Sequence, residues 1–206
     1  MFMEEVSEEN LKGLLEERIK RDSTVVSKNM INVAGFINHQ VDMKIIDMIG
    51  KLFANKFENK NINKVLTVEA SGIPPACFTA YYLNTPMLYA KKKLPKTLGR
   101  DVYFREAYSV TRGEKIPLAI SKRYLNEGDR VLIVDDFLAS GATCIAMVDM
   151  LKEAKATFCG FCAIIEKVFE SGRERLMEND IKDVYSIVKI KKMEEEVEFE
   201  DSKDDF

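Results

Sequence analysis

Two adjacent carboxylates, Asp135 and Asp136, follow a run of four apolar residues in "RVLIVDDFLASGAT". A short turn that contains Gly141 comes next, and a helical pattern begins after it. Carboxylates accept hydrogen bonds from hydroxyl groups, whereas the free N–H groups at the start of a helix attract an anion. A glycine in the turn lets the backbone approach that anion closely. This arrangement predicts a site for a ligand with both hydroxyl and phosphate groups, such as a sugar phosphate.

Two other phosphate-binding motifs are absent from the chain. No G-K-[ST] ending is present, which excludes a P-loop, and no G-x-G-x-x-G is present, which excludes a dinucleotide fingerprint. The alternative is an ordinary strand-to-helix turn in which the two acids occur by chance.

Strands and helices alternate along the chain in a way that places the acids at one edge of a sheet. Near-continuous apolar strands of this kind are typical of a parallel α/β sheet with helices on both faces. Ligands of such sheets bind beyond the carboxyl ends of the strands, where we expect Asp135 and Asp136. The expected strands are 64–70, 86–92, 130–136, 157–167 and 184–190, and the expected helices are 8–20, 41–60, 74–84, 142–155 and 171–179.

Three further segments complete a single domain over residues 1–206. Residues 93–124 are less regular and predict a hairpin or flap, and residues 28–40 predict a short extended piece and a loop. The acidic tail, 192–206, is expected to be mostly solvated, although its alternation at Val197 and Phe199 predicts an edge strand.

Composition bounds the function. The 206 residues suit one domain, and the hydrophobic share of 46% is enough for a core. A net charge of −3 argues against a general nucleic-acid binder. No apolar run approaches the roughly 20 residues of a membrane helix, and the acidic N-terminus does not resemble a signal peptide, so we expect a cytoplasmic protein.

A C-x-x-C pair, Cys159 and Cys162, lies in the strand expected over 157–167. Such a pair can serve redox chemistry or half of a zinc site. Residues three apart on a strand face opposite sides, and no second pair completes a metal site. We therefore interpret both cysteines as small apolar residues of a buried strand.

The segment "VLIVDDFLASGAT" closely resembles the phosphoribosyl pyrophosphate (PRPP) signature of the type I phosphoribosyltransferases. The resemblance implies the fold of that family, a mainly parallel sheet with helices on both faces, a small N-terminal hood and a flap. It also implies that Asp135 and Asp136 hold the ribose hydroxyls. The residues implied to cradle the 5′-phosphate are Ala139, Ser140, Gly141, Ala142 and Thr143.

A second segment, "VEASGI" at 68–73, resembles the pyrophosphate loop of the same family. By that resemblance Ala70, Ser71 and Gly72 offer backbone N–H groups to the leaving pyrophosphate. Lys91 or Lys92, after the strand at 86–92, is a candidate to meet the same group, and we select Lys92. The alternatives are an ordinary strand-to-helix turn and plain surface charge.

The base is predicted from two stretches, "IIEKVFESGRERL" and "INVAGFINHQVD". Lys167 is expected at a strand's carboxyl end, where its ammonium group can only donate, which favours the oxygen of a 6-oxo purine over the amino group of adenine. The second stretch resembles the base-covering hood segment, residues 1–40 here, of bacterial xanthine phosphoribosyltransferases. It implies that Asn38 and Ile31 contact the base, although Asn38 could instead cap the helix at 41–60.

The resemblance implies the conversion of xanthine and PRPP to xanthosine monophosphate (XMP) and pyrophosphate. Mg²⁺ would be held mainly by PRPP and pyrophosphate rather than by a dedicated protein cage, and the protein would form a homodimer. Guanine, hypoxanthine or adenine remain alternative bases. A PRPP-binding purine repressor is a further alternative, but the chain lacks a basic stripe for DNA.

Overall fold

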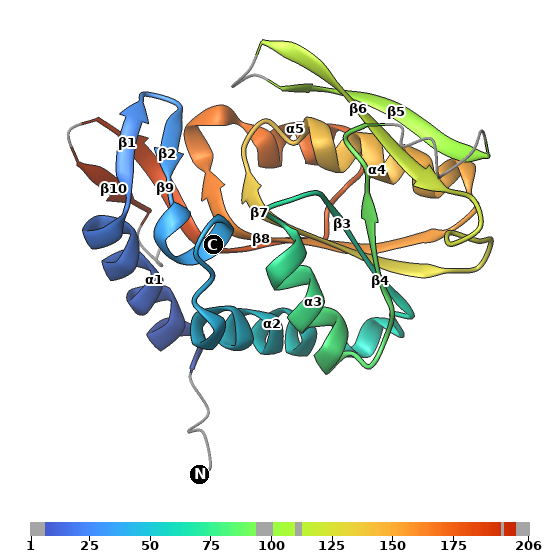
Figure 1. Cartoon of the computed structure of the whole chain (residues 1–206), viewed down its shortest axis with the longest axis horizontal. Helices are drawn as coiled ribbons and strands as arrows, with labels where there is room; N and C mark the ends of the chain where they lie inside the picture. Colours follow the sequence, from blue (N-terminus) through green and yellow to red (C-terminus); the bar gives the residue numbers. More distant parts are fainter. Residues whose placement is uncertain (1–6, 94–100, 110–112, 195, 201–206) are drawn as a thin grey trace.

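A six-stranded sheet in the order β10-β9-β8-β7-β3-β4 forms the centre of the molecule in the computed structural model (Figure 1). The structure describes residues 7–93, 101–109, 113–194 and 196–200. All neighbouring pairs in the sheet are parallel except β9 and β10, which are antiparallel. The mainly parallel sheet predicted from the sequence is therefore present. Its strands are β3 (Lys64–Val68), β4 (Met87–Ala90), β7 (Arg130–Leu138), β8 (Thr157–Lys167), β9 (Val184–Met193) and β10 (Val197–Phe199).

Helices cover both faces of this sheet. On one face, α2 (Met43–Phe57) and α3 (Ile73–Tyr82) pack with α1 (Glu8–Asp22) around a core that contains Phe36 and Phe53. On the other face, α4 (Ala142–Glu153) and α5 (Gly172–Glu178) pack over a second core that contains Met147 and Phe161. Helices α2 and α3 lie on one side of the sheet and α4 and α5 on the other (Figure 1), and the central strands β7 and β8 are mostly buried.

Strand β7 carries the two acids, and it runs further than the sequence predicted. We expected its end at Asp136, but it continues to Leu138. The cause is its neighbour β8, an eleven-residue strand that pairs with β7 as far as Leu138↔Glu166. On the other side, the pairing of β7 with β3 ends at Leu66↔Ile133. The acids therefore lie where β7 extends past β3.

The N-terminal segment is more regular than the predicted extended piece and loop. Strands β1 (Thr24–Ser27) and β2 (Met30–Asn32) form an antiparallel hairpin, and a π-helical turn, η1 (Ala34–Asn38), follows it. The side chain of Asp42, not of Asn38, caps α2, because it accepts hydrogen bonds from the backbone N–H groups of Lys44 and Ile45. The capping role considered for Asn38 is therefore wrong.

The segment predicted as a hairpin or flap contains the antiparallel strands β5 (Val102–Ser109) and β6 (Glu114–Ser121). This hairpin lies over the outer side of α4 (Figure 1), and its residues Ala107, Leu118 and Ile120 are buried in the second core. Backbone hydrogen bonds between Lys91 and Ala119 also join it to the end of β4. The strands of the flap are thus anchored to the domain.

Two smaller expectations can also be compared with the structure. Cys159 and Cys162 are free thiols buried in β8, and Cys162 packs in the first core, as predicted for a buried strand. The start of the acidic tail forms the edge strand β10, and residues 201–206 lie outside the described residues. Among the described helices, none is long and apolar enough to span a bilayer.

Helices α2 and α3 approach so closely that Gly50 is required at their contact. A Cβ at this position would overlap Phe78 Cβ and come within 2.7 Å of the Phe78 carbonyl carbon and 2.9 Å of the Thr79 nitrogen. Because backbone atoms cannot rotate away, we expect Gly50→Ala to lower the free energy of unfolding by about 1–3 kcal/mol. Urea denaturation measures this change.

Gly13 in α1 provides the matched control, because nothing lies within 4 Å of a Cβ added there. Gly13→Ala should raise the free energy of unfolding by up to about 1 kcal/mol through helix propensity alone. Equal effects of the two substitutions would contradict the proposed close contact.

Candidate active site

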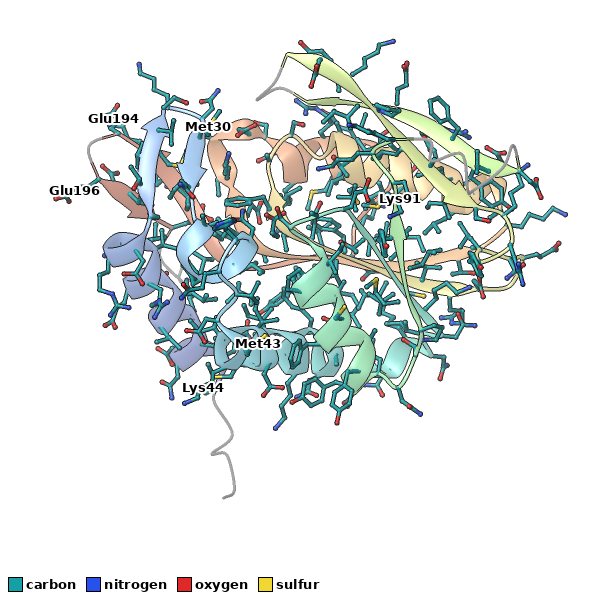
Figure 2. The ribbon with its side chains drawn as sticks, viewed as in Figure 1. Met30, Met43, Lys44, Lys91, Glu194 and Glu196 are labelled. Carbon is teal, nitrogen blue, oxygen red and sulfur yellow. The ribbon has the colours of Figure 1, made fainter. Side chains whose placement is uncertain are left out.

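A cleft at the carboxyl ends of the strands brings together segments that are distant in the sequence. Its volume is about 190 Å³. One wall is formed by the end of β7 and the turn into α4, and the other by the β5–β6 hairpin and Lys92. Lys92 follows Lys91, which is labelled in Figure 2. The residues that line the cleft include Lys92, Ala107, Tyr108, Ile116, Leu118, Asp135, Phe137 and Glu170, together with the complete loop Ala139–Thr143.

Asp135 is the more enclosed of the two acids. Its residue is 8% exposed, and its Oδ1 accepts a hydrogen bond of 2.9 Å from the backbone N–H of Asp136. Burial, followed by the charge of Asp136, raises the pKa of the Asp135 carboxyl well above its usual range. Burial also raises the pKa of Asp136, whereas the charge of Lys92 lowers both values. Asp135 lines the cleft, whereas Asp136, the next residue of β7, is not among its lining residues, and burial disfavours the ionised forms of both carboxyl groups.

The loop after β7 has the geometry of an anion site. Gly141 adopts φ +75° immediately before α4, and no side chain caps the first N–H groups of the helix. A Cβ on Gly141 would also come within 3.0 Å of the Gly172 carbonyl oxygen, so glycine is favoured for space as well as conformation. The Arg175 guanidinium donates to the Ser140 carbonyl oxygen, and all five residues of the loop Ala139–Thr143 line the cleft.

The predicted pyrophosphate loop lies against Asp135. A Cβ on Gly72 would overlap the Thr67 hydroxyl oxygen and lie 2.8 Å from Asp135 Oδ1, so the loop can approach the acid only with glycine here. Ala70 and Ser71 precede this contact in a turn that begins with a cis peptide bond between Glu69 and Ala70. Gly72 is thus beside the cleft's acid, while residues 70–72 are not part of the cleft lining itself.

The choice between Lys91 and Lys92 is clarified by their contacts. Lys92 lines the cleft, and its backbone N–H donates to Glu69 Oε1 at 2.7 Å. The Lys91 ammonium is 3.2 Å from Glu69 Oε2 and 4.2 Å from the ring centroid of Tyr89. Glu69 therefore ties both lysine positions to the pyrophosphate loop, and Lys92 is the one placed in the cleft.

Lys167 lies at the carboxyl end of β8, where the sequence predicted it, and it is buried. Its ammonium group has two partners. It donates to the Asn29 carbonyl oxygen at 2.6 Å and lies 3.3 Å from Glu170 Oε1. The Lys167 side chain is 8% exposed and the Glu170 side chain 6%. The ammonium nitrogen also lies 5.3 Å from the ring centroid of Phe137. Phe137 and Glu170 both line the cleft, so Lys167 stands directly behind its lining.

The other two predicted base contacts are not in the cleft. Ile31 is buried in β2 and pairs with Val25, and Asn38 is exposed at the end of η1. The contact between Lys167 and the carbonyl of Asn29 joins the β1–β2 hairpin to the site. The hairpin therefore contacts the carboxyl end of β8, but none of Lys167, Ile31 and Asn38 lines the cleft.

Sequence reasoning missed a buried ionic network behind the site. Arg173 donates to both carboxylate oxygens of Glu166, at 2.9 and 2.5 Å, and to Ser186 Oγ at 3.0 Å. The network fixes the end of β8 next to Lys167 and the start of α5, where Gly172 packs on the carbonyl group of Ala139. An acid inside the apolar strand 157–167 was the available signal. Phe137 and Glu170 were missed because nothing in their types marks a cleft.

Comparison with known proteins identifies what the chain is similar to. Residues 37–202 match the phosphoribosyl transferase domain family. The xanthine phosphoribosyltransferase of Brevibacillus brevis is 43% identical over 182 residues, which cover 88% of this chain and 92% of that protein. The xanthine phosphoribosyltransferase of Macrococcus caseolyticus is 40% identical over 176 residues, which cover 85% and 90%.

Solved structures give the same fold. The adenine phosphoribosyltransferase of Rhodothermus marinus superposes with a TM-score of 0.69 at 20% identity, covering 86% of this chain and 99% of that one. The adenine phosphoribosyltransferase of Thermoanaerobacter pseudethanolicus has a TM-score of 0.63 at 28% identity, covering 72% and 82%. These likenesses confirm the fold that the sequence motifs predicted.

The raised pKa of Asp135 has a consequence for stability. A carboxyl group whose pKa is higher in the folded than in the unfolded chain makes the fold less stable as the pH rises from the unfolded value, about 3.9, through the folded value. We expect Asp135→Asn to remove this loss. The variant should therefore be more stable than the wild type at pH 7 by about 1 kcal/mol or more, and the difference should shrink near pH 4. Urea denaturation at both pH values measures it.

Asp22 is a control of opposite sign. The hydrogen bond from Arg21 lowers the pKa of its carboxyl, so Asp22→Asn should be less stable than the wild type at pH 7 and should approach it at low pH. An Asp135→Asn protein that behaved in the same direction as Asp22→Asn would contradict the burial argument.

Proposed function

The chain belongs to the phosphoribosyl transferase family, and we propose that it transfers the phosphoribosyl group of PRPP to xanthine, yielding XMP and pyrophosphate. The observation that carries the proposal is the single cleft that contains Asp135, the loop 139–143 and Lys92. Carboxylates, free helical N–H groups and an ammonium group suit the ribose, the 5′-phosphate and the pyrophosphate of one PRPP molecule. The names of the bacterial relatives support xanthine as the base.

The PRPP half of the mechanism uses positioning and charge. Asp135 and Asp136 accept hydrogen bonds from the ribose hydroxyls, while the N–H groups of residues 139–143 hold the 5′-phosphate at the start of α4. The anomeric carbon then lies between the two loops. As the bond to pyrophosphate breaks, the leaving oxygen gains negative charge, which the N–H groups of residues 70–72 and Lys92 stabilise.

The base half places a purine ring nitrogen opposite the departing group. This nitrogen forms the new bond to the anomeric carbon and its proton is released to solvent or pyrophosphate, so the protein needs no nucleophile of its own. The two carboxylates would stabilise the positive charge that the ribose ring carries in the transition state. Asp135 and Asp136 fill this role better when they are ionised. The positive charge that develops on the ribose ring favours their ionised forms and so offsets the cost of burying their charge.

Lys167 supplies the preference for a 6-oxo base. Its ammonium group donates to Asn29 and Glu170 in the free protein, so the purine oxygen would replace one of these partners. An adenine amino group would oppose a donor to a donor. Ile31 and Asn38 would complete the pocket if the hairpin and η1 move toward the cleft, with Asn38 able to donate and accept at the 2-oxo edge.

The β5–β6 hairpin would cover the bound substrates. The cleft of about 190 Å³ is smaller than the roughly 300–1,000 Å³ of typical ligand pockets, which supports opening for substrate entry and closure to exclude water. Because Ala107 and Leu118 anchor the strands on α4, we place the movement at Tyr108, an exposed residue of β5 that lines the cleft, rather than in a hinged lid.

Three further features complete the proposal. Mg²⁺ would bind mainly to oxygens of PRPP and pyrophosphate, since this ion keeps several waters and takes few protein ligands. When bound, it neutralises phosphate charge. We also propose a homodimer and a cytoplasmic location, by resemblance to the family.

Other 6-oxo purines are the second candidate, because Lys167 presents the same donor to xanthine, guanine and hypoxanthine. An assay of pyrophosphate release with PRPP, Mg²⁺ and each of these bases or adenine separates the possibilities. We expect release with xanthine at least about tenfold above the others. Release mainly with adenine would contradict the role of Lys167, and PRPP binding without release for any base would favour a regulatory protein.

Lys167→Met tests the base contact in the same assay. We expect kcat/KM for xanthine to fall about 100-fold, the size of a lost hydrogen bond to a charged group, while the KM for PRPP changes less than about threefold. An unchanged rate with xanthine would remove Lys167 from the site.

Glu170→Gln is the matched control, because it breaks the same buried ion pair from the other side. Loss of either partner destabilises the fold. If only the ion pair matters, both variants should lose xanthine activity equally. If Lys167 contacts the base, Glu170→Gln should retain most of it.

A further inference from the structure

Thr67, in β3 directly before the pyrophosphate loop, carries a buried hydroxyl group with no assigned role. Its residue is 0% exposed, and its Oγ1 has no hydrogen-bond partner among the described residues. A buried hydroxyl without a partner is unfavourable, and a valine of the same shape would avoid the loss. The hydroxyl is therefore either a defect in packing or a group that acquires its partner when ligand binds.

The surroundings identify that partner. A Cβ built on Gly72 would have three nearest heavy atoms, which are Thr67 Oγ1, Asp135 Oδ1 at 2.8 Å and Asp135 Cα at 3.3 Å. The hydroxyl and the carboxylate oxygen thus both lie next to the space that a side chain on Gly72 would fill. Asp135 Oδ1 accepts one hydrogen bond, from the N–H of Asp136, and a carboxylate oxygen can accept a second.

We propose that Thr67 is a positioning residue whose hydroxyl donates a hydrogen bond to the Asp135 carboxylate when PRPP is bound. The bond holds Asp135 in the orientation that accepts the ribose hydroxyls, and Gly72 leaves the space in which it forms. Hydrogen bonds of this kind are commonly long or misaligned in a free enzyme and shorten in the complex. The inference rests on the proposed function, because it concerns how the site holds PRPP.

Two substitutions separate this role from plain packing. Thr67→Val keeps the shape and removes the hydroxyl, so the protein should melt at a temperature about 2 °C or more higher than the wild type. At the same time the KM for PRPP should rise about tenfold, with kcat and the KM for xanthine within about twofold. Thr67→Ser keeps the hydroxyl and should have a KM for PRPP close to that of the wild type.

Thr85 is a matched control, because its Oγ1 is also buried without a partner in the described part of the chain. It precedes β4 at the amino ends of the parallel strands, whereas the cleft lies at their carboxyl ends. Thr85→Val should raise the melting temperature in the same way and leave the KM for PRPP unchanged. If Thr67→Val does not fold, Thr67→Ser and Thr67→Ala allow the same comparison, since both lose the methyl group and only Ser keeps the hydroxyl.

A Thr67→Val protein that is more stable but has an unchanged KM for PRPP would overturn the inference and leave the proposed function intact. A Thr67→Ser protein as impaired as Thr67→Val, or as Thr67→Ala, would also overturn it, because PRPP binding would then be lost although the hydroxyl group is kept. A wild type that neither binds PRPP nor releases pyrophosphate would overturn both the proposed function and the inference.

Discussion

The buried carboxyl group of Asp135 is the constraint on which the site depends. It lies at the point where β7 extends past β3, next to a second acid and beneath Gly72. Burial and the neighbouring charge oppose its ionised form, so the free protein is less stable than it would be with a neutral group there. A ligand with hydroxyl donors and an associated cation would offset the cost of burying the ionised carboxyl group. The free energy recovered in this way would add to the affinity for the ligand.

The two loops that flank Asp135 are held by contacts that allow little freedom. Gly72 packs on the acid from one side, and Gly141 packs against Gly172 on the other. The start of α5 is in turn fixed by the ion pair of Arg173 with Glu166, one residue before Lys167. The groups proposed for phosphate, ribose and base are therefore braced by one connected set of elements rather than by independent loops. Such rigid support is what a reaction that depends on positioning requires.

The sequence was sufficient for the sheet and for the position of the two acids and the glycine turn at the carboxyl ends of its strands, for a physical reason. The five parallel strands are apolar runs between turns, and the acids and the glycine of the anion loop are local features whose geometry follows from strand, turn and helix start. The end of β7 was misplaced because pairing with the long strand β8, a non-local interaction, extends it. The π-helical turn at Ala34–Asn38 and the cap at Asp42 likewise depend on local competition that residue types alone do not settle.

The base half was predicted less completely, because it is assembled from distant segments. Lys167 lies behind the cleft and bonds to the hairpin at Asn29, contacts that join β8 to a part of the chain more than one hundred residues away. Asn38 is exposed, and its proposed contact requires movement that neither the sequence nor the free structure specifies. Phe137 and Glu170 enter the site only through the path of the backbone after β7 and β8. No periodicity or motif marks such positions.

The central claim is that Asp135, Asp136 and the loop 139–143 hold PRPP. A crystal structure of the protein with PRPP and Mg²⁺ tests it most directly. The account predicts the 5′-phosphate within hydrogen-bond distance of the backbone N–H groups of residues 139–143, with the ribose hydroxyls on Asp135 and Asp136. A phosphate bound elsewhere, with Asp135 still in contact only with its own chain, would contradict it.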